Sequence, residues 1–285
     1  MKFVSYDTMA TTIRQNLWKL PHDVDVVVGV PRSGMIAALM IGELMHKRVT
    51  DLDSFTEGRM MGCGGRGGLI RETQTGKVLV VDDTVYSGTN MTKVRERLEP
   101  LADRYAFTFM CIYTDGFGAK RFVDIVLEDI AGQDGPLLLY EWNILHHYEE
   151  VSRKMMWDID GLLCKEPPWD SDTEAYERYL REPVPMVIPT TRLGAIVTYR
   201  LEKYRDVTEA WLERMGIQYG RLIMFPANDA EERNLACPSW RFKAMIYKEH
   251  EWAHLFVESS DYQAELIRHY AGKPAYAYES GKLYK

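Results

Sequence analysis

Residues 77–91 read KVLVVDDTVYSGTNM, and this stretch decides the fold of the first half of the chain. An aliphatic run ends in two adjacent acids, Asp82 and Asp83, and a loop of hydroxyl side chains with one glycine follows. Adjacent buried acids repel each other and lose hydration, so a fold is expected to place them where a cation or a polyol meets them. The simpler interpretation is a strand followed by a helix that Asp83 or Thr84 caps.

The segments around this stretch alternate between strand and helix patterns. Apolar runs at residues 23–30 and 105–113 predict two further strands, and helical spacing is found at residues 6–18, 34–46 and 91–100. Such alternation is typical of a parallel sheet covered by helices. Ligands of these sheets bind beyond the carboxyl ends of the strands, where both GVPRSG (residues 29–34) and DDTVYSGTN (residues 82–90) fall.

A second unit of the same kind is expected after a polar stretch at residues 146–154. It begins with MMWDIDGLLC (residues 155–164), and the segments GAIVTYR and HLFVESSD supply later strand ends with helical patterns between them. The predicted fold class is therefore α/β, with two domains that each contain a mainly parallel sheet flanked by helices. The predicted domains are residues 1–149 and residues 150–285.

Composition excludes several classes of function. The formal charge is −7, with 16 basic against 20 acidic residues up to position 149 and 19 against 22 beyond it, so nucleic acid is not an expected partner. The cysteines at 63, 111, 164 and 237 form no CxxC pair, which suits a reducing compartment. No signal peptide and no membrane span is expected, and the expected location is the cytoplasm.

The loop after the two acids has the parts of an anion site. Main-chain N–H groups entering a helix, hydroxyls and a glycine can cradle a phosphate, while two carboxylates can meet the hydroxyls of a sugar. These residues resemble the phosphoribosyl pyrophosphate (PRPP) signature of type I phosphoribosyltransferases, although Tyr86 stands where a threonine is more usual. The resemblance implies that PRPP is bound by Asp82, Asp83, Tyr86, Ser87, Gly88, Thr89 and Asn90.

The same resemblance implies two further loops. VVVGVPRSG (residues 26–34) would hold pyrophosphate, with Arg32 meeting the diphosphate and Ser33 and Gly34 donating nearby hydrogen bonds. The glycine-rich segment at residues 58–72 would form a mobile hood, in which Arg66 neutralises the leaving group. The implied reaction displaces pyrophosphate at the anomeric carbon, with Mg²⁺ as the cofactor.

The second unit carries an Asp-x-Asp-Gly pattern. A carboxylate nucleophile needs a cation that offsets the incoming phosphate and a neighbouring acid that protonates the leaving oxygen. WDIDGLLC resembles the first motif of haloacid dehalogenase (HAD) phosphatases, which implies Asp158 as nucleophile and Asp160 as acid and base. Later motifs imply Thr198 as a phosphate ligand, Lys243 or alternatively Lys248 as the lysine, and Mg²⁺ ligation by Asp158, Asp160, Glu258 and Asp261. The segment between the first two motifs, residues 163–195, is too short for a substantial cap.

Together the two resemblances imply a bifunctional enzyme. The first domain would transfer 5-phosphoribosyl from PRPP to an acceptor, and the second would remove the 5-phosphate, which suits ribosylation of a glycan hydroxyl. One alternative is a nucleobase phosphoribosyltransferase with a nucleotide phosphatase, where Tyr140 or Trp142 stacks on the base and Glu141 or Asn143 reads its edge. Another is a PRPP-sensing regulator. The expected partners are PRPP and a glycan or nucleobase acceptor, with a homodimer as the candidate assembly.

Overall fold

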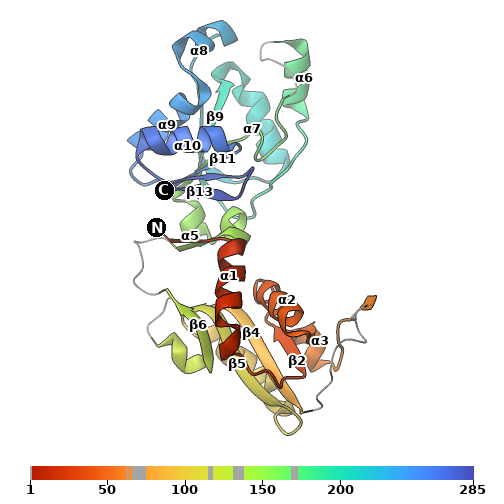
Figure 1. The fold of residues 1–285 in the computed structure, drawn as a ribbon. Helices are drawn as coiled ribbons and strands as arrows, with labels where there is room; N and C mark the ends of the chain where they lie inside the picture. The colour runs from red at the N-terminus through yellow and green to blue at the C-terminus, as the bar shows by residue number, and fades with distance from the viewer. Residues whose placement is uncertain (1, 63, 66–74, 115–117, 131–137, 168–172) are drawn as a thin grey trace. The chain divides into compact units, whose positions relative to one another are not determined.

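The computed structural model describes residues 2–62, 64–65, 75–114, 118–130, 138–167 and 173–285. The chain divides into two compact units, Met1–Trp142 and Asn143–Lys285 (Figure 1). Each unit is built around its own mainly parallel sheet with helices against it. The predicted α/β class, with two such sheets, is confirmed.

The first unit contains a five-stranded sheet in the order β3-β2-β4-β5-β6, in which every strand pair is parallel. A separate parallel pair joins β1 and β7. The helices and strands of this unit are β1 (Lys2–Val4), α1 (Tyr6–Asn16), β2 (Val26–Gly29), α2 (Gly34–Met45), β3 (Arg48–Asp51), α3 (Leu52–Thr56), β4 (Lys77–Val85), α4 (Thr89–Leu98), β5 (Ala106–Thr114), β6 (Ile125–Asp129) and β7 (Leu138–Tyr140).

Alternation along β4 explains why this sheet is covered on both faces. Leu79 and Val81 pack with residues of α1 and α2 in one core cluster, whereas Val78 and Val80 pack with residues of α3 and α4 in another. Successive side chains of a strand point to opposite faces, so a continuous aliphatic run needs helices on both sides. The buried run therefore fixes β4 as a central strand, and its carboxyl end carries the polar residues.

The second unit contains a six-stranded sheet in the order β10-β9-β8-β11-β12-β13, which is parallel except for the antiparallel edge strand β13. Its helices and strands are α5 (Glu149–Ser152), β8 (Met155–Trp157), α6 (Glu174–Arg181), β9 (Leu193–Leu201), α7 (Arg205–Arg214), β10 (Tyr219–Phe225), α8 (Ala230–Ala236), α9 (Ser239–Glu249), β11 (Leu255–Glu258), α10 (Asp261–Ala271), β12 (Ala275–Ala277) and β13 (Lys282–Tyr284).

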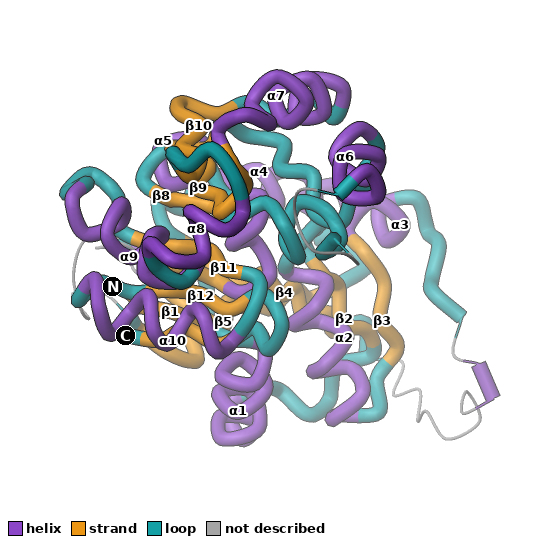
Figure 2. The backbone as a smooth tube through the Cα atoms, turned by 90° about the horizontal axis from the view of Figure 1, so that it is seen from above, coloured by secondary structure: helices purple, strands orange, loops and turns teal. Residues whose placement is uncertain are grey.

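The central strands of this second sheet, β8 and β11, are buried along their whole length. Helices α9 and α10 pack on each other, and α10 also packs against β11 and β12, as the tube in Figure 2 shows. Within the described residues, no helix is long and apolar enough to cross a membrane. The polar residues that follow β8, β9 and β11 consequently gather at one edge of this sheet.

Candidate active sites

The two acids of the first unit lie within the last residues of β4 and are nearly inaccessible to solvent. Asp82 is 6% exposed and Asp83 is 7% exposed. One oxygen of Asp82 accepts a hydrogen bond from the Asp83 N–H (3.0 Å), and the other accepts one from Nδ2 of Asn90 (3.4 Å). Burial, followed by the charge of Asp83, raises the pKa of Asp82 to about 8. A cation bound beside Asp82 would lower this pKa and stabilise the charged carboxylate.

The loop between β2 and α2 packs directly against these acids. Ser33 donates a hydrogen bond from Oγ to Oδ1 of Asp83 (2.9 Å), and a Cβ at Gly34 would lie 2.8 Å from the Val81 carbonyl oxygen. Only glycine allows so close an approach of the loop to the strand. The peptide bond between Pro31 and Arg32 is cis. The loop expected to hold pyrophosphate and the acids expected to hold ribose are thus adjacent.

The hydroxyl loop after β4 leads directly into α4. The Oγ of Ser87 and the Oγ1 of Thr89 lie 3.0 Å apart, and Ser87 Oγ accepts from the Thr89 N–H at 3.4 Å. Gly88 precedes the first residue of α4 with a φ of +79°, a left-handed conformation that favours glycine. The loop therefore presents hydroxyls and the amino end of a helix, the usual setting for a phosphate.

A contact that the sequence did not reveal joins the acids to the end of the first unit. Trp142 donates a hydrogen bond from Nε1 to Oδ2 of Asp83 (2.7 Å). Its ring stacks on Tyr140, with centroids 4.8 Å apart and planes 30° apart, and the Tyr6 ring lies 5.8 Å away. The indole is therefore held by a carboxylate and a stacked ring at once.

The remaining residues expected at the PRPP site differ in their surroundings. Arg32, Tyr86, Thr89 and Asn90 are exposed, with Tyr86 at 68%. Arg66 lies outside the described residues, as does most of the predicted hood. The structure thus brings Ser33, Gly34, Asp82, Asp83 and the loop at residues 87–90 together, and it leaves the arginine of the hood undescribed.

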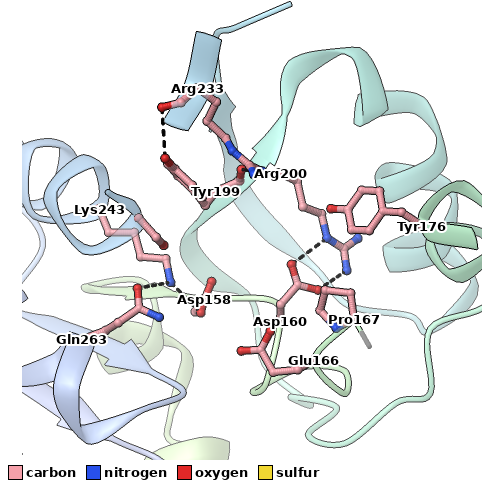
Figure 3. A pocket seen from close by; sticks show the side chains of 11 residues that line it. Asp158, Asp160, Glu166, Pro167, Tyr176, Tyr199, Arg200, Arg233, Lys243 and Gln263 are labelled. Carbon is pink, nitrogen blue, oxygen red and sulfur yellow. Dashed lines mark hydrogen bonds and ion pairs between the residues drawn. The ribbon is translucent and has the colours of Figure 1, made fainter. Parts of the chain in front are cut away.

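In the second unit, a buried lysine joins two buried acids. Lys243, on α9, donates from Nζ to Asp158 Oδ2 (2.7 Å) and to Glu258 Oε2 (2.8 Å), as the close view of the pocket shows for Asp158 (Figure 3). All three side chains are at most 4% exposed. Burial and the charge of Glu258 raise the pKa of Asp158 well above its ordinary value. Burial alone would lower the pKa of Lys243, but the charges of the two acids outweigh it and raise that pKa.

Asp160 has a different environment, because Arg200 from β9 donates two hydrogen bonds to its carboxylate. Nε of Arg200 lies 3.0 Å from Oδ2 and Nη2 lies 2.6 Å from Oδ1, while the Tyr179 hydroxyl donates to Oδ1 at 3.2 Å. Burial would raise the pKa of Asp160, but the Arg200 charge and hydrogen bonds outweigh it, so the net shift is downward. Arg200 itself is 1% exposed. Asp160 is consequently held as a carboxylate in the structure.

These residues line a pocket of about 260 Å³. Its wall contains Asp158, Asp160 and Lys243 from the expected motifs, together with residues that sequence reasoning did not single out: Glu166, Pro167, Tyr176, Tyr199, Arg200, Arg233, Ser239 and Gln263. The sequence could have indicated Arg200 as a site residue, because it lies two residues after Thr198 on one strand and so shares a face with it. Nothing in the sequence indicated Tyr176 and Gln263, because they reach the pocket from distant helices.

Other expected residues lie outside this pocket wall. Thr198 is fully buried, and its Oγ1 accepts from the Arg200 N–H at 3.2 Å. Lys248 is exposed, with its Nζ 5.7 Å from the centre of the Tyr270 ring. Asp261 accepts hydrogen bonds through Oδ1 from Ser280 Oγ and Tyr284 Oη, each at 2.7 Å. Of the two candidate lysines, the one that contacts the acids is Lys243.

The carboxylates of Asp158 and Glu258 are of the ligand type that Mg²⁺ prefers. Asp158 and Glu258 bring two buried carboxylates to one ammonium group, and hard oxygen ligands are what Mg²⁺ prefers. The Oε1 of Glu258 already accepts from the N–H and the Oγ of Ser259, each at 2.9 Å. In the described part of the chain, no cluster of three or more acidic, histidine or cysteine side chains forms a ready metal site.

Comparison with protein-family models gives no match, and neither does comparison with curated proteins. Among solved structures, the chain is similar to the xanthine-guanine-hypoxanthine phosphoribosyltransferase of Helicobacter pylori, at 17% identity over 50% of this chain and 93% of that chain, with a TM-score of 0.36. It is also similar to an orotate phosphoribosyltransferase from Aeropyrum pernix, at 20% identity over 44% of this chain and 71% of that chain (TM-score 0.32).

A chain of a Pnkp1/Rnl/Hen1 complex is similar over a longer stretch, 88% of this chain and 94% of that chain, at 14% identity and a TM-score of 0.34. Similarities at these identities and scores do not carry a functional argument. The residues of the two candidate sites are therefore the basis for assigning a function to the chain.

Proposed function

We propose that the chain is a bifunctional enzyme that transfers 5-phosphoribosyl from PRPP to an acceptor and then removes the 5-phosphate through a phosphoaspartate. The first step is assigned to a phosphoribosyltransferase domain, residues 1–149, and the second to a HAD-like phosphatase domain, residues 150–285. The single observation that carries the proposal is the buried Lys243 between Asp158 and Glu258, because an ammonium group in that place serves a phosphorylated carboxylate.

The transferase step is supported by the hydrogen bond from Ser33 to Asp83, which joins the two expected substrate loops. In this proposal Asp82 and Asp83 meet the ribose hydroxyls, and the loop at residues 87–90 holds the 5-phosphate at the start of α4. Arg32 and Arg66 offset the charge of the departing pyrophosphate. Transfer then proceeds by loss of pyrophosphate from the anomeric carbon and bond formation to the acceptor oxygen or nitrogen.

The phosphatase step is supported by the pocket that Asp158 lines. Asp158 attacks phosphorus, and Lys243 remains beside it to offset the charge of the phosphoaspartate. Asp158 and Glu258 are the side chains that would hold Mg²⁺, which when bound supplies positive charge next to the transferring phosphoryl group. A carboxyl group of the same pocket must protonate the leaving oxygen, and the family resemblance gives that role to Asp160.

The proposed acceptor is a glycan hydroxyl. One face of the Trp142 indole is stacked on Tyr140, so a nucleobase that used this residue could stack only on its other face. A joined phosphatase also fits a product that must lose its phosphate, since both steps then act on one ribosyl group. Two alternatives remain, a nucleobase phosphoribosyltransferase with a nucleotide phosphatase and a PRPP-sensing regulator. The following experiment distinguishes both from this proposal.

The experiment measures the two steps separately in one preparation. The purified full chain is incubated with PRPP, Mg²⁺ and either a host glycan extract or a set of nucleobases, while pyrophosphate and inorganic phosphate are recorded. Asp83→Asn is expected to abolish release of both products. Asp158→Asn is expected to keep pyrophosphate release and to lose phosphate release, with Lys248→Met as a control that keeps both.

Pyrophosphate release that requires a nucleobase would contradict the glycan acceptor and favour the nucleobase phosphoribosyltransferase. Tight PRPP binding without release under any condition would favour the sensor. Phosphate release that survives in Asp158→Asn would contradict the phosphoaspartate step.

A further inference from the structure

Helix α8 packs against the second unit through an arginine rather than through its apolar residues. Of its seven residues, all of which the structure describes, Arg233 is the buried one at 9% exposed, whereas Leu235 is 81% exposed. Burial of a leucine is favourable and an arginine is usually left at the surface, so a short helix is expected to pack the other way round. This orientation leaves the leucine in water and brings a guanidinium inward, which indicates a use for its charge.

The guanidinium of Arg233 is held over the ring of Tyr199 in the wall of the phosphatase pocket. Nη1 donates to the main-chain oxygen of Tyr199 (3.2 Å), while Nε and Nη2 donate to Oδ1 of Asn234 (3.3 and 3.2 Å). The Cζ atom lies 4.4 Å from the centre of the Tyr199 ring, a favourable cation–π distance. The Tyr199 hydroxyl in turn donates to the main-chain oxygen of Arg233, as Figure 3 shows. These contacts fix the guanidinium in the pocket wall before a substrate binds.

The wall of this pocket carries both signs of charge. Its described residues include three acids and three bases: Asp158, Asp160, Glu166, Arg200, Arg233 and Lys243. Arg200 and Lys243 each donate to acids of the pocket. A phosphomonoester brings about two further negative charges at neutral pH, and the acids repel it unless cations of the wall offset that charge. Arg233 adds such a charge, in the fork geometry that matches phosphate oxygens.

The size of the pocket brings a phosphate close to Arg233. The pocket measures about 260 Å³, which is small for a ligand site, and Lys243 and Arg233 both border it. Figure 3 shows these two side chains reaching the pocket from different helices. A phosphate bound beside Asp158 therefore fills a large part of the space, with Lys243 from α9 and Arg233 from α8 in the surrounding wall.

We propose that Arg233 binds the phosphate group of the phosphatase substrate, a dianionic phosphate monoester, and that α8 is the element that carries this residue to the pocket. The inference rests on the phosphatase activity proposed above. Arg233 takes no part in the covalent step. It donates hydrogen bonds to oxygens that stay on phosphorus, so it binds the substrate and inorganic phosphate alike.

The test measures the affinity for inorganic phosphate, which has the group that Arg233 binds and nothing else. The full chain with Mg²⁺ is titrated with inorganic phosphate in a calorimeter, and KM for ribose 5-phosphate is measured beside it. For Arg233→Met we expect Kd and KM to rise by the same factor of about 10 to 100, because hydrogen bonds to a charged group are lost. The matched control is Arg241→Met. Arg241 is exposed on α9, also lies over a tyrosine ring and is outside the described wall, so both constants should stay near those of the unmodified chain.

Arg233→Lys separates phosphate binding from a structural role. Lysine keeps the charge but lacks the fork that joins α8 to Tyr199 and Asn234, so the α8 amides should exchange faster with solvent while Kd rises only about threefold. A Kd that rises less than about twofold in Arg233→Met would overturn the proposal. So would an Arg233→Lys variant that binds phosphate as weakly as Arg233→Met, because affinity would then follow the packing of α8. A chain that binds phosphate through Arg233 but hydrolyses no phosphomonoester would contradict the proposed phosphatase and leave the binding role of Arg233 supported.

Discussion

Replacement of Lys243 by methionine tests whether the lysine neutralises the buried acids of the second unit. Lys243 Nζ lies 2.7 Å from Asp158 and 2.8 Å from Glu258, and all three side chains are almost completely buried. Methionine keeps the length and the apolar stem of lysine but removes its charge. Two carboxylates are then left without a cation in a place that water scarcely reaches.

The expected cost follows from this burial. Removing one partner of a buried ion pair destabilises a protein by about 3–5 kcal/mol, whereas a pair exposed on the surface contributes about 0–1 kcal/mol. We therefore expect Lys243→Met to lose about 3–5 kcal/mol of unfolding free energy in the second unit at pH 8. The second change in Lys243→Met/Glu258→Gln removes one of the unpaired charges and should restore roughly half of that loss.

The loss should also depend on pH. In the variant, burial raises the pKa of Asp158 in the folded state, so the folded state binds more protons than the unfolded state between the two pKa values. Stability is then lowest at high pH and recovers as the pH falls through the folded-state pKa. The loss should therefore be smaller at pH 5.5 than at pH 8.

Native-state hydrogen exchange of the β8 and β11 amides, read by mass spectrometry, reports the second unit alone. The matched control is Lys248→Met, on the same helix but exposed, which should change the exchange free energy by less than about 0.5 kcal/mol. A loss below about 1 kcal/mol in Lys243→Met, or an equal loss in the control, would show that Lys243 does not neutralise the buried acids. A loss that does not change with pH would do the same.

Three further predictions concern the first unit. Because the pKa of Asp82 is raised to about 8, binding of PRPP with Mg²⁺ at pH 7 should release a proton, and calorimetry in buffers of different ionisation enthalpy should show this release vanish in Asp82→Asn. Trp142→Phe removes the hydrogen bond to Asp83 and should cost about 1.5–3 kcal/mol in denaturant unfolding of this unit, so a neutral result would contradict the contact. Gly88→Ala would drive a Cβ into the Phe122 ring at a φ of +79°, and it should lower stability by about 1–3 kcal/mol and weaken PRPP binding, which a thermal-shift titration would reveal.

Much of the fold could be predicted from the sequence because its strands are apolar runs of distinct length. The run at residues 77–82 predicts β4 as a central strand, although the strand continues to Val85 through the two acids. The structure has two short strands after residue 273, β12 and β13, which pair antiparallel. Strands of three residues are too short to show a periodic pattern, and their pairing depends on the neighbouring strand.

The residues of the candidate sites could also be predicted only in part. Residues inside a local motif, such as Asp82, Asp83, Asp158 and Lys243, could be selected from their order along the chain. The residues that form hydrogen bonds with these side chains could not be selected in this way. Trp142 reaches Asp83 across 59 positions, and the hydroxyl of Tyr179 reaches Asp160 across 19. Contacts of this kind come from packing, which a single sequence does not encode in any regular spacing.

In the proposed function, one chain adds a phosphoribosyl group to an acceptor and then removes the phosphate of that group. The most direct measurement is the mass of the acceptor after incubation of the Asp158→Asn variant with PRPP, Mg²⁺ and glycan extract, next to the same incubation with the unmodified chain. We expect an acceptor that carries ribose plus phosphate with the variant and ribose alone with the unmodified chain. The same modified acceptor from both proteins, or no modified acceptor from either, would contradict it.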